Sequence, residues 1–203
     1  MSVYLDGRHI STSAELVELY AERIAAFGVS SVAMFYASEE QHVSKLQAFS
    51  EAAATVLRSG ESVLEIGSGY GQLLNYCSVP GTYLGVELVL AFVEEARRRH
   101  PSQRFVHADI MNLEVGSWDW VLMPGVLSAV PQPKMLLRRA IDIAQLGVLF
   151  DVTVEGRLPS SYRDLNRWQL SDAYRFIAST GFQATTMADR NRSWVILAAT
   201  PKP

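Results

Sequence analysis

The segment VLEIGSGYG places an acid, Glu65, ahead of three glycines at alternate positions, Gly67, Gly69 and Gly71. Glycine is favoured where the backbone needs a positive φ or where a ligand touches the chain. The spacing therefore predicts a loop whose backbone contacts a ligand. A tight connection between a strand and a helix is the alternative explanation for the same glycines.

The residues around this loop indicate which ligand it would hold. A dinucleotide-binding loop reads GxGxxG and would need glycine at position 72, where the chain has Gln72. A carboxylate at Glu65 would repel a pyrophosphate but would suit a cationic or ammonium-bearing ligand. The next apolar segment, YLGVE, ends at Glu87, and an acid there can accept hydrogen bonds from both hydroxyls of a ribose. A solvated strand end is the alternative for Glu87.

Short apolar strands alternate with helical segments after Gly60. We predict strands at 62–66, 82–87, 104–109, 119–123 and 147–152, and helices at 71–77, 90–100 and 133–145. Such alternation predicts an α/β fold with a parallel sheet and helices on both faces. A helix at about 171–180 then precedes strands at 182–188 and 193–200, joined by a polar turn at 189–192. This close pair predicts an antiparallel hairpin at one edge.

Two amphipathic helices precede the strands. Thr12 with Glu15 and Ser38 with Gln41 form capping boxes, and the helices run to Gly28 and Gly60. We interpret residues 1–58 as a helical cover or lid and residues 59–203 as the ligand-binding domain. The linker VSSVAMFYASEEQ contains Met34, Phe35 and Tyr36. These side chains would either close over an apolar ligand or anchor the linker to the core.

Composition excludes several classes of protein. The chain has 203 residues, 49% of them hydrophobic, and its net charge of -3 argues against a nucleic-acid partner. A single cysteine, Cys77, rules out an internal disulfide, and no apolar run approaches membrane-spanning length, so we expect a cytoplasmic protein without membrane contact. We predict no metal site, because the four histidines lack metal-binding spacing: His9, His42, His100 and His107.

The chain resembles the class I S-adenosylmethionine-dependent methyltransferases from about Phe35 to Thr200. The motifs that carry the resemblance are VLEIGSGYG, YLGVE, FVHADI and DWVLMPGVL. The resemblance implies a Rossmann-like, mostly parallel sheet of seven strands that ends in an antiparallel hairpin. It also implies S-adenosylmethionine as the cofactor.

By the same resemblance, the glycines pass beneath the methionine and ribose, and Glu65 holds neighbouring amides or the ammonium group. Asp109 would accept the adenine amine and Ile110 would pack on the ring, although Asp109 could instead cap a turn. The methionine end would meet residues of the N-terminal helices, two of which also fit an ordinary polar helix face. The predicted cofactor residues are Glu65, Gly67, Ser68, Gly69, Gly71, Glu87, Leu88, Asp109, Ile110 and Pro124, with Tyr36, Gln41 and Lys45 at the methionine end.

Two features that the sequence lacks limit the kind of methyl acceptor that we expect. Met123-Pro124-Gly125-Val126 stands where enzymes that methylate exocyclic amines carry an Asn/Asp-Pro-Pro-aromatic tetrad, and 127–164 contains no histidine base. We therefore assign no catalytic residue. The segment TVEGRLPSSYRDLNRW is dense in polar and aromatic groups, although an ordinary solvated loop would also explain it. The predicted acceptor-binding residues are Tyr36, Asp151, Tyr162, Asn166, Arg167 and Trp168.

These observations predict methyl transfer from S-adenosylmethionine to an oxygen or nitrogen atom of a small-molecule metabolite. An RNA or protein methyltransferase is the alternative enzyme. A non-catalytic partner subunit that binds S-adenosylmethionine is the alternative of another class.

Overall fold

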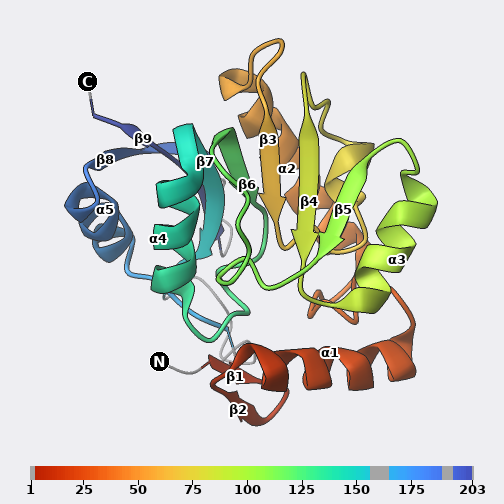
Figure 1. Cartoon of the computed structure of the whole chain (residues 1–203). Coiled ribbons are helices and arrows are strands. Elements are labelled where there is room, and N and C mark those ends of the chain that lie inside the picture. The colour runs from red at the N-terminus through yellow and green to blue at the C-terminus, as the bar shows by residue number, and fades with distance from the viewer. Residues whose placement is uncertain (1–2, 156–164, 189–193, 203) are drawn as a thin grey trace. The chain divides into compact units, whose positions relative to one another are not determined.

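The computed structural model describes residues 3–155, 165–188 and 194–202. By its internal contacts the chain forms two compact units (Figure 1). We call residues 13–114 the glycine-loop unit, and residues 1–12 with 115–203 the hairpin unit. Seven strands form a mixed sheet in the order β5-β4-β3-β6-β7-β9-β8, which confirms the predicted mostly parallel sheet with a C-terminal antiparallel hairpin.

Three parallel strands form the centre of the glycine-loop unit: β3 (Val63–Ile66), β4 (Tyr83–Glu87) and β5 (Arg104–His107). All residues of β3 and β4 are buried, as expected for strands that are covered on both faces. Helix α3 (Leu90–Arg99) packs on β4 and β5, and Figure 1 shows α2 (Glu39–Val56) behind these strands. Helix α1 (Ser13–Phe27) precedes them.

The helix ends follow the predicted capping signals with small shifts. Helix α1 stops before Gly28, which has a φ of +66°. The Ser38 hydroxyl caps α2 by accepting a hydrogen bond from the Gln41 amide at 3.3 Å. The Gln41 side chain reaches back to the Ala37 amide at 2.9 Å, one residue earlier than a capping box requires. Helix α2 ends at Val56, short of Gly60.

The helix predicted at 71–77 is wrong. The chain forms only a short 3-10 helix there, η1 (Gln72–Asn75). Residues 76–82 must return the chain to β4, and they include Pro80, which cannot continue a helix. A side chain at Gly81 would meet the Glu61 carbonyl oxygen at 2.5 Å, so the backbones run too close together for further helical turns.

The hairpin unit contains the remaining four strands of the sheet. Strands β6 (Trp118–Met123) and β7 (Ala144–Thr153) are parallel, whereas β8 (Phe182–Ala188) and β9 (Trp194–Pro201) pair antiparallel. Helix α4 (Pro133–Ile143) packs on β6 and β7, and α5 (Leu170–Ser179) packs on β8. The turn predicted at 189–192 lies outside the described residues.

A second, two-stranded hairpin was not predicted. It comprises β1 (Val3–Leu5) and β2 (Arg8–Ile10), paired antiparallel. Both turn residues have positive φ, +51° at Asp6 and +77° at Gly7. An Asp-Gly pair between short apolar segments is a strong signal for such a turn, so the sequence contained the information.

Candidate functional site

The carboxyl ends of β3, β4 and β5 bring the predicted cofactor residues together within the glycine-loop unit. The Gly67 amide donates to the Val86 carbonyl at 2.8 Å, and the Ala108 amide donates to the Glu87 carbonyl at 3.0 Å. The glycine loop, the acid after β4 and Asp109 therefore lie at one edge of the sheet, where open α/β sheets bind their ligands.

Glu87 is bound directly to the glycine loop. One carboxylate oxygen accepts the Gly69 amide and the other accepts the Val89 amide, both at 2.9 Å. Burial raises the pKa of this carboxyl, while the two amide bonds act in the opposite direction. The alternative of a solvated strand end is wrong, because Glu87 is buried. Each oxygen keeps a further lone pair that can accept a hydroxyl.

Glu65 has a different partner from the one predicted. Its carboxylate accepts a hydrogen bond from the Tyr83 hydroxyl at 2.5 Å, and both side chains are buried. Burial raises the pKa of Glu65 to about 8, so the group is mostly protonated at neutral pH. Sequence reasoning missed Tyr83. Tyr83 lies on the strand next to Glu65. In the register of β3 and β4, Glu65 pairs with Gly85, and Tyr83 is two residues earlier on the same face of the sheet.

The glycines of the loop have different neighbours. A Cβ on Gly69 would lie 3.0 Å from the Met34 sulfur, whereas a Cβ on Gly71 would lie 2.7 Å from His100 and 3.2 Å from Phe105. Gly67, Gly69 and Gly71 all have positive φ, of +70°, +53° and +79°. Gly71 is thus required by packing and backbone conformation, whereas the side of Gly69 where a Cβ would lie faces Met34 of the linker. Within the described residues, the buried Ser68 hydroxyl has no hydrogen-bond partner.

Asp109 caps a turn, as the alternative reading held. One oxygen accepts the Met111 amide at 2.9 Å, and the other accepts the Ser13 hydroxyl, at the start of α1, at 2.8 Å. The adenine role of Asp109 stays a prediction alongside this structural one. Ile110 is buried next to it, and Leu88 lies one residue after Glu87. No sequence signal indicated Ser13.

The residues predicted for the methionine end cluster only in part. Tyr36 stacks on His42 with ring centroids 4.0 Å apart, and the Lys45 ammonium lies 5.8 Å from the Tyr36 ring. Burial lowers the pKa of His42 to about 4, so this histidine is neutral at physiological pH. Gln41 is exposed and caps the helix. Sequence reasoning missed His42, since a single histidine in a helix has no distinctive spacing.

In the hairpin unit, two predicted acceptor residues organise the loop after β6. Asp151 accepts the Gly125 amide at 2.5 Å, next to Pro124. The Asn166 side chain donates to the carbonyls of Leu127 at 3.0 Å and Val130 at 2.6 Å. These bonds fix the shape of the loop after β6, and the acceptor-binding roles of Asp151 and Asn166 stay predictions.

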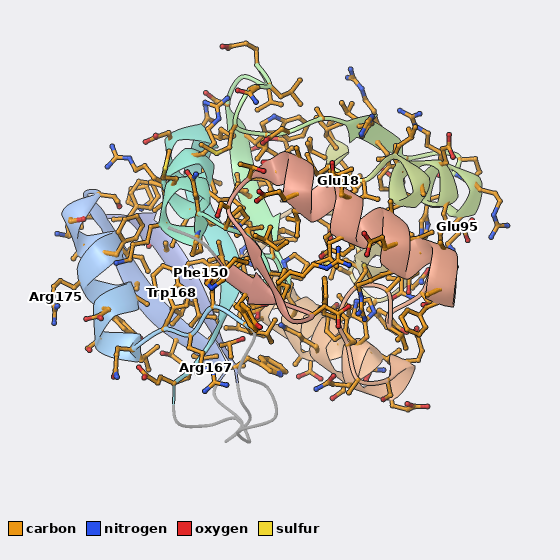
Figure 2. All side chains as sticks on the ribbon, turned by 90° about the horizontal axis from the view of Figure 1, so that it is seen from below. Glu18, Glu95, Phe150, Arg167, Trp168 and Arg175 are labelled. Atoms are coloured by element: carbon orange, nitrogen blue, oxygen red, sulfur yellow. The ribbon has the colours of Figure 1, made fainter. Side chains whose placement is uncertain are left out.

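Trp168 is a core residue. Its ring is buried, with its centroid 6.4 Å from that of Phe176 on α5, and its amide donates to Thr153 at 2.8 Å (Figure 2). Arg167 is half-buried beside it. The acceptor roles of both residues stay predictions. Tyr162 lies outside the described residues, as do Arg157, Arg163 and Asp164.

Two further searches covered only the residues that the structure describes. They contain no group of three or more histidine, cysteine or acidic side chains arranged to hold a metal ion. None of their helices combines the length and apolar character needed to cross a bilayer.

Comparison with known proteins gives one family match. A family model described as a methyltransferase domain matches residues 64–149, which include the glycine loop and Glu87. The search of curated proteins found no match.

Solved structures share the fold at low identity. Magnesium protoporphyrin IX methyltransferase from Synechocystis PCC 6803 with bound SAH has 15% identity and a TM-score of 0.70, covering 94% of this chain and 100% of that one. A putative methyltransferase complexed with the Haloferax volcanii Trm112 activator has 16% identity and a TM-score of 0.70, covering 91% and 98%. A possible histamine N-methyltransferase from Thermotoga maritima has 17% identity and a TM-score of 0.66, covering 92% and 100%.

Proposed function

We propose that the chain is a class I S-adenosylmethionine-dependent methyltransferase, which its matched domain and its fold support, and that it methylates an oxygen or nitrogen atom of a small molecule. The observation that carries the proposal is the bond between Glu87 and the Gly69 amide. It sets a buried carboxylate beside a glycine that has no side chain of its own to separate the backbone from a ligand.

The glycine-loop unit fits a sulfonium nucleoside. The carboxylate of Glu87 has lone pairs left for the ribose hydroxyls, and Gly69 supplies backbone without a side chain. The buried Ser68 hydroxyl lacks a partner among the described residues and can bond to a bound ligand. Asp109 and Ile110 follow the neighbouring strand and are assigned to the adenine. The cofactor supplies an already activated methyl group, so the protein mainly binds and orients.

A small-molecule acceptor is supported by three observations. The net charge of -3 offers no broad attraction for a nucleic acid. Met123-Pro124-Gly125-Val126 lacks the tetrad used on exocyclic amines, and Asp151 and Asn166 secure the loop that contains these residues. Two of the similar structures also carry small-molecule names, a magnesium porphyrin and histamine.

Methyl transfer depends more on positioning the acceptor than on proton transfer. In-line approach of an acceptor to the methyl group can supply about 7–11 kcal/mol of the barrier lowering. A general base is needed only when the acceptor must lose its proton early. No histidine follows His107 in the sequence. Residues 115–203 of the hairpin unit therefore offer no imidazole that could act as a general base on an acceptor. An amine or an acidic hydroxyl fits this arrangement best.

We also propose that residues 1–58 cover the domain formed by residues 59–203. For residues 13–58 this is supported by packing within one unit. Tyr20, Ile24, Val29 and Met34 pack against a buried cluster of Ala33, Tyr70, Val89 and Phe92. The N-terminal helices thus contact the glycine loop itself through Tyr70.

A methyl-transfer screen tests the proposed function. The purified chain is incubated with S-adenosylmethionine that carries a trideuterated methyl group and with separate pools of small hydroxyl compounds, small amines, RNA and proteins. We expect the label in a small-molecule pool only, and not with a Glu87→Ala variant. Label in RNA or protein would support the alternative enzyme. Cofactor binding without transfer to any pool would indicate a non-catalytic subunit.

A further inference from the structure

The linker between α1 and α2, residues 29–37, covers the glycine loop. The Met34 sulfur lies 3.0 Å, and its methyl carbon 3.9 Å, from the position that a Cβ on Gly69 would take. Gly69 is the residue whose amide binds Glu87. The Met34 thioether therefore lies against the point where the glycine loop meets the proposed ribose acid.

Arg23 of α1 holds the linker in this position. Its Nε donates to the Ala33 carbonyl at 3.1 Å and its Nη2 to the Val32 carbonyl at 2.5 Å. The guanidinium also lies 4.2 Å from the centroid of the Phe35 ring, a cation–π distance. These contacts fix the residues on both sides of Met34.

A second anchor joins the linker to the end of the glycine loop. Ser31 donates to one oxygen of Glu39 at 2.6 Å, and Gln72 donates to the other at 3.0 Å. Glu39, at the start of α2, thus links the first turn of the linker to η1. A movement of the linker that contains Met34 would therefore also disturb the end of the glycine loop.

The linker backbone is strained next to Met34. Phe35 has a φ of +67°, in the left-handed region that non-glycine residues rarely adopt. Such a residue stays in place only when surrounding contacts hold it there, and strain of this kind is common in segments that move during function. Here the holding contacts are those of Arg23 with the linker and of Phe35 with Tyr20, whose rings lie 5.4 Å apart.

We propose that Met34 is a built-in competitor of the cofactor. Its side chain covers the face of Gly69 that the ligand must contact, so S-adenosylmethionine binds only when the linker lifts and the Arg23 contacts open. This inference rests on the proposed function, since it takes the glycine loop as the cofactor site. The observed affinity is then the intrinsic affinity reduced by the fraction of molecules whose linker is open.

The test compares the binding of S-adenosylhomocysteine by titration calorimetry and its association rate by stopped flow. Met34→Ala removes the competing side chain, and Arg23→Gln removes the charge that holds the linker. We expect both variants to bind faster and to lower the dissociation constant at least about threefold. Met34→Leu keeps a side chain of similar size and should stay close to wild type. Arg98→Gln makes the same charge change on the exposed face of α3, where Arg98 pairs with Glu95. This variant should leave the affinity and the association rate unchanged.

Unchanged or weaker binding by both Met34→Ala and Arg23→Gln would overturn the proposal and make Met34 part of the site's wall. Thermal unfolding checks that each variant is folded. If Met34→Ala does not fold, the binding of S-adenosylhomocysteine by Arg23→Gln alone decides whether the proposal holds. Failure of the proposed function looks different, because then wild type and all four variants would bind no S-adenosylhomocysteine.

Discussion

At the scale of single residues, two glycines of the loop look alike in the sequence but have different neighbours in the structure. Gly71 and Gly69 both have positive φ, but a side chain at Gly71 would meet the rings of His100 and Phe105, whereas one at Gly69 would meet the flexible end of Met34. The two glycines therefore have different structural surroundings, and only Gly69 combines a flexible neighbour with the proposed role in ligand binding.

This difference predicts opposite effects of the same substitution. We expect Gly71→Ala to lower the thermal stability markedly, since His100 and Phe105 must move in addition to the cost of about 1–2 kcal/mol for positive φ. Gly69→Ala should incur mainly the cost of positive φ, yet should weaken binding of S-adenosylhomocysteine. Thermal unfolding and calorimetry of both variants check this. A Gly69→Ala variant with wild-type affinity would remove Gly69 from the cofactor site.

Glu87 should affect both affinity and folding. Glu87→Ala removes the predicted ribose acceptor, and each charge-assisted bond lost should weaken S-adenosylhomocysteine binding by about 1.5–3 kcal/mol. It also leaves the Gly69 and Val89 amides without their acceptor, so the free energy of unfolding should fall as well. Glu87→Gln is the matched control, because it keeps one carbonyl oxygen. An affinity unchanged in both variants would contradict the ribose role.

Glu65 should make stability depend on pH. Its pKa rises from 4.5 to about 8 in the folded state, so between these values the folded chain holds a proton that the unfolded chain has lost. The resulting stabilisation is fully present below pH 4.5 and is lost as the pH rises through 8. Its slope is up to about 1.4 kcal/mol per pH unit.

Urea unfolding between pH 6.5 and 8 measures this slope. The lower limit is the ordinary pKa of histidine, 6.5, because the lowered pKa of His42 makes stability depend on pH only below that value. We expect Glu65→Gln to flatten the dependence, and Glu114→Gln, an exposed acid, to leave it as in wild type. A wild-type slope in Glu65→Gln would show that Glu65 is ionised in the folded state.

At the scale of elements, the sequence predicted most strands because each is a short apolar run between turn residues. It failed where tertiary constraints overrode local preference. The apolar segment after Gly71 looks helical, but the close approach of Gly81 to Glu61 leaves space only for η1. The β1–β2 hairpin was missed although its Asp-Gly turn is visible in the sequence.

The loop after β6 depends on an element far away in sequence. Asn166 donates to the carbonyls of Leu127 and Val130, so Asn166→Ala should cost about 1–3 kcal/mol of unfolding free energy for buried carbonyls left unpaired. Hydrogen exchange should rise at residues 125–130. Ser171→Ala, an exposed change on α5, serves as the control. Unchanged exchange at 125–130 would show that the loop holds its shape without Asn166.

At the scale of the whole molecule, the proximity of the residues proposed for the cofactor could be predicted because parallel strands bring their carboxyl ends to one edge of a sheet. That rule alone brought Gly67, Glu87 and Asp109 together. Side-chain partners could not be predicted in the same way. The bond from Tyr83 to Glu65 depends on register, and the contact of Met34 with Gly69 depends on a positive φ at Phe35 that no local pattern indicates.

The central claim is that the glycine loop and Glu87 hold S-adenosylmethionine and not a dinucleotide. Titration calorimetry of the purified chain with S-adenosylhomocysteine, and separately with NAD, tests it most directly. We expect S-adenosylhomocysteine to bind at one site per chain, Glu87→Ala to weaken that binding, and NAD to give no binding heat. Binding of NAD that Glu87→Ala weakens, with no binding of S-adenosylhomocysteine, would contradict the account.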